Sequence, residues 1–126
     1  MYKNLDMFRT SLAMAQHAGT RQALVATNIA NADTPGYRAQ SIAPFSETDQ
    51  MSRPAGMHVT RPGHIQPDRE AAVVRTQLSD EEPSPNGNTV SIEAEMLRAV
   101  DIEREHNRAL TIYRHSLTVL RTSLGR

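Results

Sequence analysis

Histidines are the residues of this chain whose chemistry most readily suggests metal binding or catalysis. The five are His17, His58, His64, His106 and His115. No two of them have the i, i+4 spacing that places a pair of zinc ligands on one face of a helix. We therefore predict no metal site and expect solvated or partner-contacting histidines. A small hydrolase that uses His58 and His64, which flank a Pro-Gly turn, is the weakest functional alternative.

The other sequence motifs of enzyme active sites are missing. There is no cysteine, so disulfides, thiolate metal sites and cysteine nucleophiles are excluded. Gly-x-Ser-x-Gly, Gly-x-Gly-x-x-Gly and Gly-x-x-x-x-Gly-Lys do not occur. The densest carboxylates alternate with arginines: Asp101, Glu103 and Glu105 with Arg98, Arg104 and Arg108. This alternation is typical of a solvated helix face or of inter-subunit ion pairs, so we predict no catalytic residues, no cofactor and no enzymatic activity.

Length, charge and hydropathy restrict the fold and the partners. At 126 residues the chain is long enough for one ordinary domain. Its fourteen basic and fourteen acidic residues cancel, which gives no electrostatic basis for binding nucleic acid. No apolar run reaches the length of about eighteen residues that a bilayer-spanning helix needs. Residues 1–6 lack the apolar core and small-residue cleavage site of a Sec signal peptide.

The stretch from Asn4 to Ala32 predicts one long helix, because it contains no proline and a single glycine. At 1.5 Å per residue this helix would be about 40 Å long. Steps of three and four residues define an apolar seam along it: Leu5, Phe8, Leu12, Ala15, Gly19, Gln22, Ala26 and Ile29. The seam is rich in small residues and would permit close approach of a neighbouring helix.

The stretch from Ile92 to Leu124 predicts a second helix, about 50 Å long. Ser91 can cap its first turn, and Asn88 or Thr89 would serve equally well. One broad apolar face contains Ile92, Met96, Ala99, Ile102, Ala109, Leu110, Tyr113, Leu117, Leu120 and Leu124. A second, sparser stripe lies roughly opposite, at Leu97, Ile112 and Val119. One partner helix cannot cover both surfaces, and leaving them in water is costly, so we infer self-assembly or packing among similar helices.

The middle of the chain, between Pro35 and Asn88, predicts an irregular segment that is partly β or disordered. It holds all seven prolines and four of the six glycines. The best strand candidates are residues 58–60 and 71–78, and residues 79–85 are typical of a solvated linker. We therefore divide the chain into an N-terminal helix (1–34), a middle segment (35–89) and a C-terminal helix (90–126), with the two ends forming one structural domain.

A polar stretch of distinctive order lies at the end of the first predicted helix and continues beyond it. Asn28 and Asn31 lie three residues apart and share a helix face, where their amides could bond backbone carbonyls or a partner chain. Thr34 precedes a proline and is biased away from the α region, so the helix should end near residues 32–33. Pro35-Gly36 suits the central pair of a type II turn.

Two stretches of the sequence resemble the bacterial flagellar basal-body rod protein family. Ala-Thr-Asn-Ile-Ala-Asn-Ala-Asp-Thr-Pro-Gly-Tyr, at residues 26–37, resembles the N-terminal signature of rod and hook proteins, and Arg38 supplies the basic residue that often follows. Pro-Asn-Gly-Asn-Thr-Val-Ser-Ile-Glu-Ala-Glu-Met, at residues 85–96, resembles the Asn-x-Val box that opens the C-terminal helix of proximal-rod members. The short middle segment is also more similar to the proximal-rod type than to the longer distal-rod and hook proteins.

This resemblance implies a mainly α fold in which two long terminal helices pack as a coiled-coil-like hairpin. The protein would be a structural subunit of the proximal rod, self-assembling through these helices into the drive shaft that transmits motor torque for motility. Its partners would be copies of itself, other rod subunits, and membrane-ring and export-gate components at the rod base, without nucleic acid or membrane insertion. It would lie in the periplasm-spanning rod and be exported by the type III route without a cleaved signal peptide.

The residues expected to set turn geometry or interfaces come from both stretches and from the last helix: Asn28, Asn31, Thr34, Pro35, Gly36, Tyr37, Asn88, Val90, Met96, Leu110, Leu117 and Leu120. A second class of protein fits the same helices, namely a non-polymerising helical-hairpin adaptor that binds one heterologous partner helix. Sedimentation separates the two hypotheses, because a rod subunit would form growing oligomers and an adaptor would bind stoichiometrically.

Overall fold

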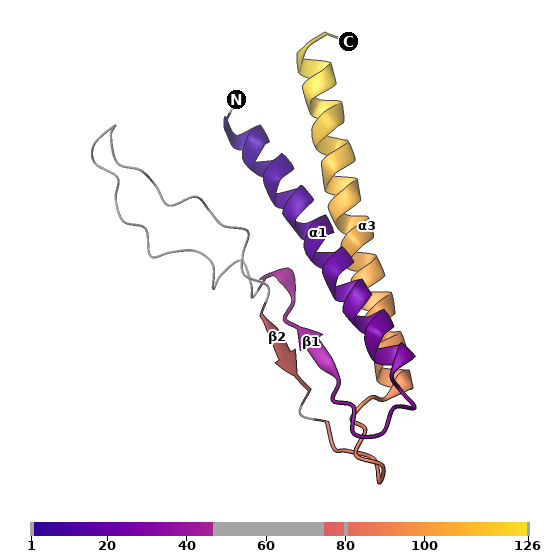
Figure 1. The fold of residues 1–126 in the computed structure, drawn as a ribbon. Helices are drawn as coiled ribbons and strands as arrows, with labels where there is room; N and C mark the ends of the chain where they lie inside the picture. The colour runs from indigo at the N-terminus through magenta and orange to yellow at the C-terminus, as the bar shows by residue number, and fades with distance from the viewer. Residues whose placement is uncertain (1, 47–74, 80, 126) are drawn as a thin grey trace, which may run out of the picture.

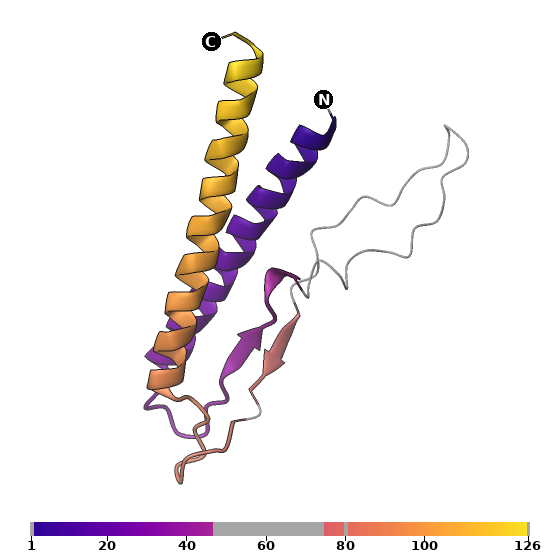
Figure 2. The ribbon, with the colours of Figure 1, turned by 180° about the vertical axis from the view of Figure 1, so that it is seen from behind.

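The computed structural model describes residues 2–46, 75–79 and 81–125. Its elements are α1 (Tyr2–Ala30), β1 (Gln40–Ile42), β2 (Thr76–Leu78) and α3 (Ile92–Ser123). The two helices pack side by side and antiparallel, with both chain ends at the same end of the hairpin (Figure 1). The two strands lie beside α1 near the closed end, as the view from behind also shows (Figure 2). This arrangement confirms the predicted fold class, with a small two-stranded sheet in the middle segment.

The start of α3 agrees with the prediction. Ser91 has extended backbone geometry, and its Oγ accepts a hydrogen bond from the Ala94 N–H at 3.4 Å, which makes it the N-cap rather than either alternative. Glu93 and Glu95 place negative charge in the first turn, near the positive end of the helix dipole. Local capping chemistry therefore sets this helix boundary.

Mostly small side chains that repeat every seven residues form the contact between the helices. The buried positions are Ser11, Ala18 and Val25 on α1, and Glu95, Ile102, Ala109 and Ser116 on α3. Ala18 and Ala109 are 1% and 0% exposed, and their size allows the helix backbones to approach closely. Both buried serines donate to carbonyl oxygens of their own helix, at 3.0 and 2.9 Å, so neither hydroxyl lacks a partner. A seven-residue repeat keeps one narrow seam in register along both helices.

The apolar seam predicted for α1 is wrong as the contact with α3. Leu12 is 53% exposed and Ile29 is 38% exposed, and Gly19 and Ala26 are exposed as well. The buried positions fall one residue earlier in each heptad, about 100° around the helix. The seam was predicted from the periodicity of apolar side chains, several of them large. The contact with α3 is instead made mostly by small side chains, because these let the two backbones approach closely. The described chain therefore leaves most of the predicted seam uncovered.

The sheet is a short antiparallel pair in which Ser41 of β1 lies opposite Gln77 of β2. β2 falls within the strand predicted over residues 71–78. β1 was missed, because three residues without a sustained alternation of apolar and polar side chains give no strand signal. The other predicted strand, 58–60, lies outside the described residues.

The sheet and the chain after it cover one side of α1. Ile42 of β1 is only 8% exposed. Just beyond it, the ring of Phe45 packs edge-on against His17 of α1, with the centroids 5.6 Å apart. One side of the hairpin therefore has a cover supplied by the middle segment.

The close helix contact can be tested with Ala109→Leu. The larger side chain would be forced against α1, so we expect the free energy of unfolding to fall by about 1–3 kcal/mol, measured by urea denaturation of dilute protein. Ala23→Leu, at an exposed position of α1, is the control and should change it by less than about 0.5 kcal/mol. Equal effects of the two substitutions would contradict close packing at Ala109.

Candidate functional site

The first signature stretch terminates α1 and turns the chain back toward the sheet. α1 ends at Ala30, two residues before the predicted boundary. The Tyr37 N–H donates to the Thr34 carbonyl at 3.3 Å across Pro35-Gly36, and Gly36 has a φ of +71°. A positive φ at the third position defines a type II turn and favours glycine there, so the predicted turn is confirmed.

The second signature stretch packs directly against this turn. The Gly36 N–H donates to the Asn86 carbonyl at 3.0 Å, and the Thr89 N–H donates to the Tyr37 carbonyl at 3.0 Å. Gly87 has a φ of +80°, and a Cβ at that position would lie 3.4 Å from the Gly36 Cα. The two stretches, fifty residues apart in sequence, thus form one closed end of the hairpin.

Asn28 joins α1 to the first strand. Its side chain is fully buried, its Nδ2 donates to the Gln40 carbonyl at 2.7 Å, and its Oδ1 accepts from the Gln40 N–H at 3.2 Å. The Tyr37 hydroxyl donates to the same Oδ1 at 3.3 Å. The amide therefore pairs with the backbone of β1 as a neighbouring strand would. The Nδ2 of Asn31 also donates to a neighbouring backbone carbonyl, as predicted, namely that of Thr27 in α1, at 2.8 Å.

Asn88 joins the end of α1 to the start of α3. Its side chain is 2% exposed, and its Nδ2 lies 2.7–2.9 Å from three main-chain carbonyl oxygens: those of Asn31, Ala32 and Thr34. Carbonyls at a helix C-terminus lack intrahelical partners, and this amide supplies one. Its Oδ1 accepts from the Val90 N–H at 2.7 Å. We call Asn28 and Asn88 the asparagine clasp.

Two further residues of the closed end were not among the predicted site residues. The Ala39 N–H donates to the Thr89 Oγ1 at 2.8 Å, and both residues are buried. Thr89 was considered only as a helix cap, and an alanine in an irregular stretch carries no sequence signal.

A chain of ion pairs lies next to the clasp. Glu95 is fully buried on α3 and pairs with Arg98, which also pairs with Glu81. Burial opposes the charge of Arg98, but hydrogen bonds to both carboxylates and their charges raise the pKa of its guanidinium above the ordinary value. The prediction of a solvated linker is wrong for Glu81, because its carboxylate is held against α3.

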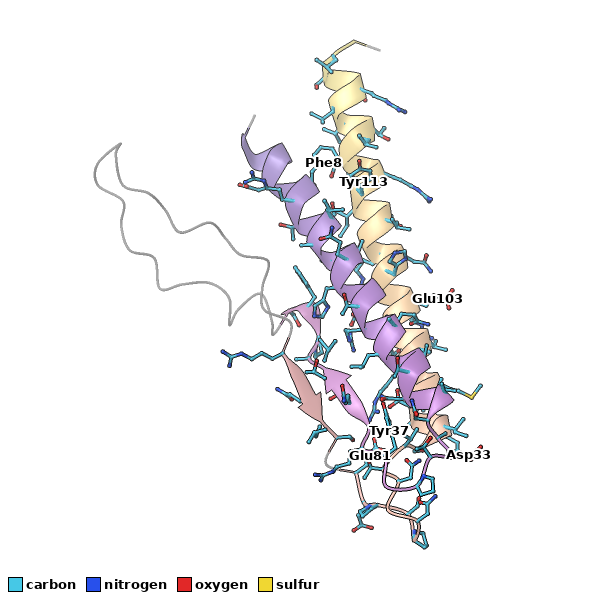
Figure 3. All side chains as sticks on the ribbon, viewed as in Figure 1. Phe8, Asp33, Tyr37, Glu81, Glu103 and Tyr113 are labelled. Carbon is cyan, nitrogen blue, oxygen red and sulfur yellow. The ribbon has the colours of Figure 1, made fainter. Side chains whose placement is uncertain are left out.

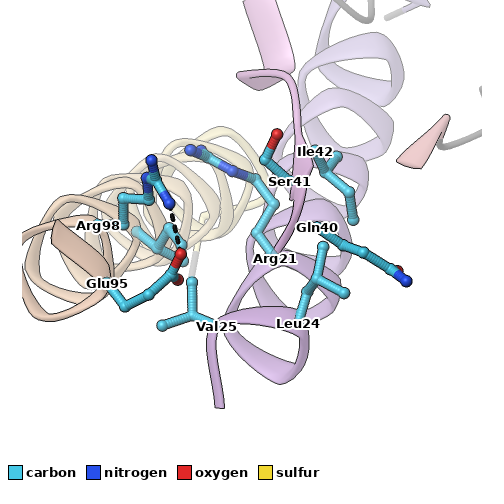
Figure 4. Close-up of a pocket in the computed structure, with 9 residues that line it drawn as sticks. Arg21, Leu24, Val25, Gln40, Ser41, Ile42, Glu95 and Arg98 are labelled. Atoms are coloured by element: carbon cyan, nitrogen blue, oxygen red, sulfur yellow. Dashed lines mark hydrogen bonds and ion pairs between the residues drawn. The ribbon is translucent and has the colours of Figure 1, made fainter. Parts of the chain in front are cut away.

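A second ion pair crosses directly between the helices. The Nη1 of Arg21 on α1 lies 2.5 Å from the Oε2 of Glu105 on α3. Glu105 therefore does not belong to the solvated face on which it was expected. Asp101 and Arg104 do form an exposed pair, at 3.3 Å. Arg21 and Arg98 also line a cavity of about 130 Å³ between the helices and β1 (Figure 4). Sequence spacing within one helix could not reveal a partner on the other.

His17 contradicts the expectation of solvated or partner-contacting histidines. Its side chain is 6% exposed, and neither ring nitrogen has a hydrogen-bond partner among the residues that the structure describes. Burial lowers the pKa of His17, the charge of Arg21 lowers it further, and the charge of Glu105 partly offsets both. The described residues also contain no group of three metal-ligating side chains.

The side of α1 that faces away from the sheet is apolar and largely uncovered. His17, Leu24 and Asn28 mark the sheet side, because they contact or line cavities with residues 40–45. At 100° per residue, the opposite side carries Phe8, Leu12, Ala15, Gly19 and Ala26. Only Phe8 and Ala15 of these are partly buried.

The corresponding side of α3 holds most of the predicted interface residues of that helix. Arg98, Glu105 and Arg108 line cavities beside the chain at 40–46 and mark the sheet side. The opposite side carries Ile92 and Met96, which are 44% and 61% exposed, and the half-buried Leu110 and Leu117. Leu120 is half-buried closer to the helix contact.

We call the combined surface, formed by Phe8, Leu12, Ala15, Gly19 and Ala26 of α1 with Ile92, Met96, Leu110 and Leu117 of α3, the bare face. Phe8 and Tyr113 make an edge-on contact between the helices near the open end, with the ring centroids 5.3 Å apart (Figure 3). The candidate site thus has two parts, a closed end that fixes the hairpin and a largely apolar face that the described residues cover only in part.

Comparison with known proteins assigns the class. The model of a family described as "Flagella basal body rod protein" matches residues 12–38, which span α1 from Leu12 to its end and the turn after it. The flagellar basal body rod protein FlgB of Agrobacterium fabrum is 32% identical over 108 residues, covering 82% of this chain and 81% of that protein. FlgB of Salmonella typhimurium and of Escherichia coli are 31% and 32% identical, each over 121 residues, and cover 86% and 85% of this chain and 88% and 87% of those proteins.

The two-helix fold and these matches define a flagellar basal body rod protein, which is a structural class rather than an enzymatic one. Within that class, the chain belongs to the FlgB family. The resemblance seen in the sequence and the predicted function as a rod subunit are thereby confirmed. No helix in the described part of the chain has the length and hydropathy needed to cross a membrane.

The asparagine clasp can be tested with Asn88→Asp. The substitution replaces a donor with an acceptor facing three carbonyl oxygens, so we expect the free energy of unfolding to fall by about 3 kcal/mol in urea denaturation. Asn107→Asp, at an exposed position of α3, is the matched control. A clasp variant as stable as the control would show that these hydrogen bonds do not hold the closed end together.

Burial of His17 makes hairpin stability depend on pH. Because its pKa is lowered in the folded chain, the unfolded chain binds the proton first as pH falls below about 6.5. The His17 contribution to the free energy of unfolding is complete above that pH and is lost below it, by at most about 1.4 kcal/mol per pH unit.

Urea denaturation at pH 7.5, 6 and 5 measures this loss. We expect His17→Phe to remove part of the decline, whereas His115→Phe, at an exposed position, should retain it. The same pH dependence in all three proteins would contradict the buried neutral imidazole.

Proposed function

We propose that the chain assembles through its terminal helices, with copies of itself and with other rod subunits, into the drive shaft that carries motor torque along the proximal rod. The bare face is the observation that carries this proposal. It runs along both helices on the side opposite the sheet, and its larger members include Leu12 and Met96, both more than half exposed. Covering such side chains is favourable by about 25 cal/mol per Å² of apolar surface removed from water.

The hairpin has the mechanical features that a shaft subunit needs. Its helices span 29 and 32 residues, and the asparagine clasp and the ion pairs fix them to each other. Intrachain packing uses small residues, so the bulkier apolar ones remain available for neighbouring subunits. Transmission of torque requires a stiff assembly and no chemistry at any residue.

The same proposal covers the location, export and further partners of the subunit. The subunit lies in the periplasm-spanning part of the rod and leaves the cytoplasm by type III export without a cleaved signal peptide. At the rod base it contacts membrane-ring and export-gate components. The resemblance of both signature stretches to proximal-rod proteins supports these assignments, and the family membership supports assembly with other rod subunits.

The proposal is tested by placing charge on the bare face. We expect the double variant Leu12→Glu, Met96→Glu to keep its helical circular dichroism, because both side chains are exposed, but to lose concentration-dependent oligomers in sedimentation velocity. Introduced in place of the wild-type gene, it should abolish swarming. Thr111→Glu, an exposed position outside the bare face, should do neither.

Two results would contradict the proposal. The first is a double variant that assembles and supports motility like the wild type. The second is a wild-type chain that never grows beyond a one-to-one complex with a heterologous helix, which is the behaviour of the adaptor.

A further inference from the structure

Charge on α3 is separated along its length. Residues 93–105 contain five acidic residues and two arginines, a formal charge of −3, and residues 106–125 contain three arginines and no acidic residue, a formal charge of +3. The helix dipole favours this order only in the first and last turns. Asp101, Glu103, Arg108 and Arg114 lie well inside the helix, so the dipole does not account for them.

Three of these charges lie along the bare face. Arg114 and Arg121 follow Glu103 by 11 and 18 residues, which are close to whole numbers of helical turns, so all three point in nearly the same direction as Met96. All three are exposed, and none makes an ion pair with the residues that the structure describes. Figure 3 shows Glu103 on the side of α3 away from the strands.

These charges cannot satisfy one another within a single chain. At 1.5 Å per residue, Glu103 is about 16 Å from Arg114 and about 27 Å from Arg121 along the helix axis. Both separations exceed the reach of an ion pair. The described residues thus offer these three side chains no partner of opposite sign, and a second copy of this chain carries the complementary pattern.

We propose that neighbouring copies pack in parallel through the bare face, with their α3 helices shifted by two heptads, about 21 Å. This shift places Glu103 of one copy between Arg114 and Arg121 of the next, and Met96 of one copy beside Leu110 of the next. Met96, Leu110 and Leu117 of the bare face are themselves separated by fourteen and seven residues, so a shift of fourteen sets apolar positions of this face against each other. The proposal rests on the proposed function, because it specifies how the assembling copies meet.

The alternative arrangements fail on charge or on growth. Parallel copies without a shift would set Glu103 against Glu103 and arginine against arginine, which is repulsive. Antiparallel copies would pair the charges but form a two-fold contact that closes after two chains. A shifted parallel contact is heterologous, so in each pair one copy keeps its basic half free and the other keeps its acidic half free for further neighbours.

Charge reversal in the full chain tests the shift. One variant carries Glu103→Arg and the other carries Arg114→Glu with Arg121→Glu, and circular dichroism confirms that both are folded. In sedimentation velocity at about 50 mM salt, we expect each variant alone to need at least about tenfold higher concentration for oligomers, equivalent to about 1.4 kcal/mol. An equimolar mixture should restore growth, because the reversed patches are complementary. In about 0.5 M salt, which screens the charges, the wild type and both variants should form oligomers at similar protein concentrations.

A matched control exchanges the exposed pair outside the bare face, Asp101→Arg with Arg104→Asp, and should assemble like the wild type. If both reversed variants grow like the wild type, the shifted contact is wrong and the proposed function stands. Closure of the wild type into a discrete dimer would also overturn the shift. A wild type that remains monomeric at every concentration would contradict the proposed function itself.

Discussion

Backbone groups that a helix end leaves unpaired are the constraint on which this structure depends. α1 stops at Ala30, and the Nδ2 of Asn88 lies within hydrogen-bond distance of the Asn31 and Ala32 carbonyl oxygens just beyond this helix end. At the same end, Asn28 provides the pairing that β1 would otherwise lack on its inner edge. Two amides therefore hold the helices and the sheet in one unit, which is why Asn28 and Asn88 are polar yet buried.

The distribution of side-chain sizes separates folding from assembly. Alanine and serine occupy much of the contact inside the hairpin, together with the ion pair between Arg21 and Glu105. Several larger apolar side chains, among them Leu12, Met96 and Leu97, are turned outward instead. Such a chain forms a modest core by itself, and the remaining hydrophobic free energy becomes available only among neighbouring molecules.

Features with local causes could be predicted from the sequence. The two helices, the Ser91 cap and the type II turn at Pro35-Gly36 follow from propensity, capping and proline chemistry within a few residues. The α3 side of the helix contact was predicted in part, because Ile102 and Ala109 belong to its predicted apolar face and are buried. The α1 side was not, because it depends on how closely two backbones approach, and apolar periodicity pointed one residue away from it. Burial of His17 and the cross-helix partner of Glu105 depend on tertiary geometry in the same way.

The antiparallel register of the sheet has a consequence for how the chain can be lengthened. Ile42 and Thr76 lie opposite each other, so the segment between them leaves and returns through the same narrow neck. A domain grafted at this position would start and finish at neighbouring points, outside the helices and the clasp. The connection between the two strands is therefore a suitable insertion site for an epitope or a fluorescent protein, because the insertion would leave the helical hairpin unchanged.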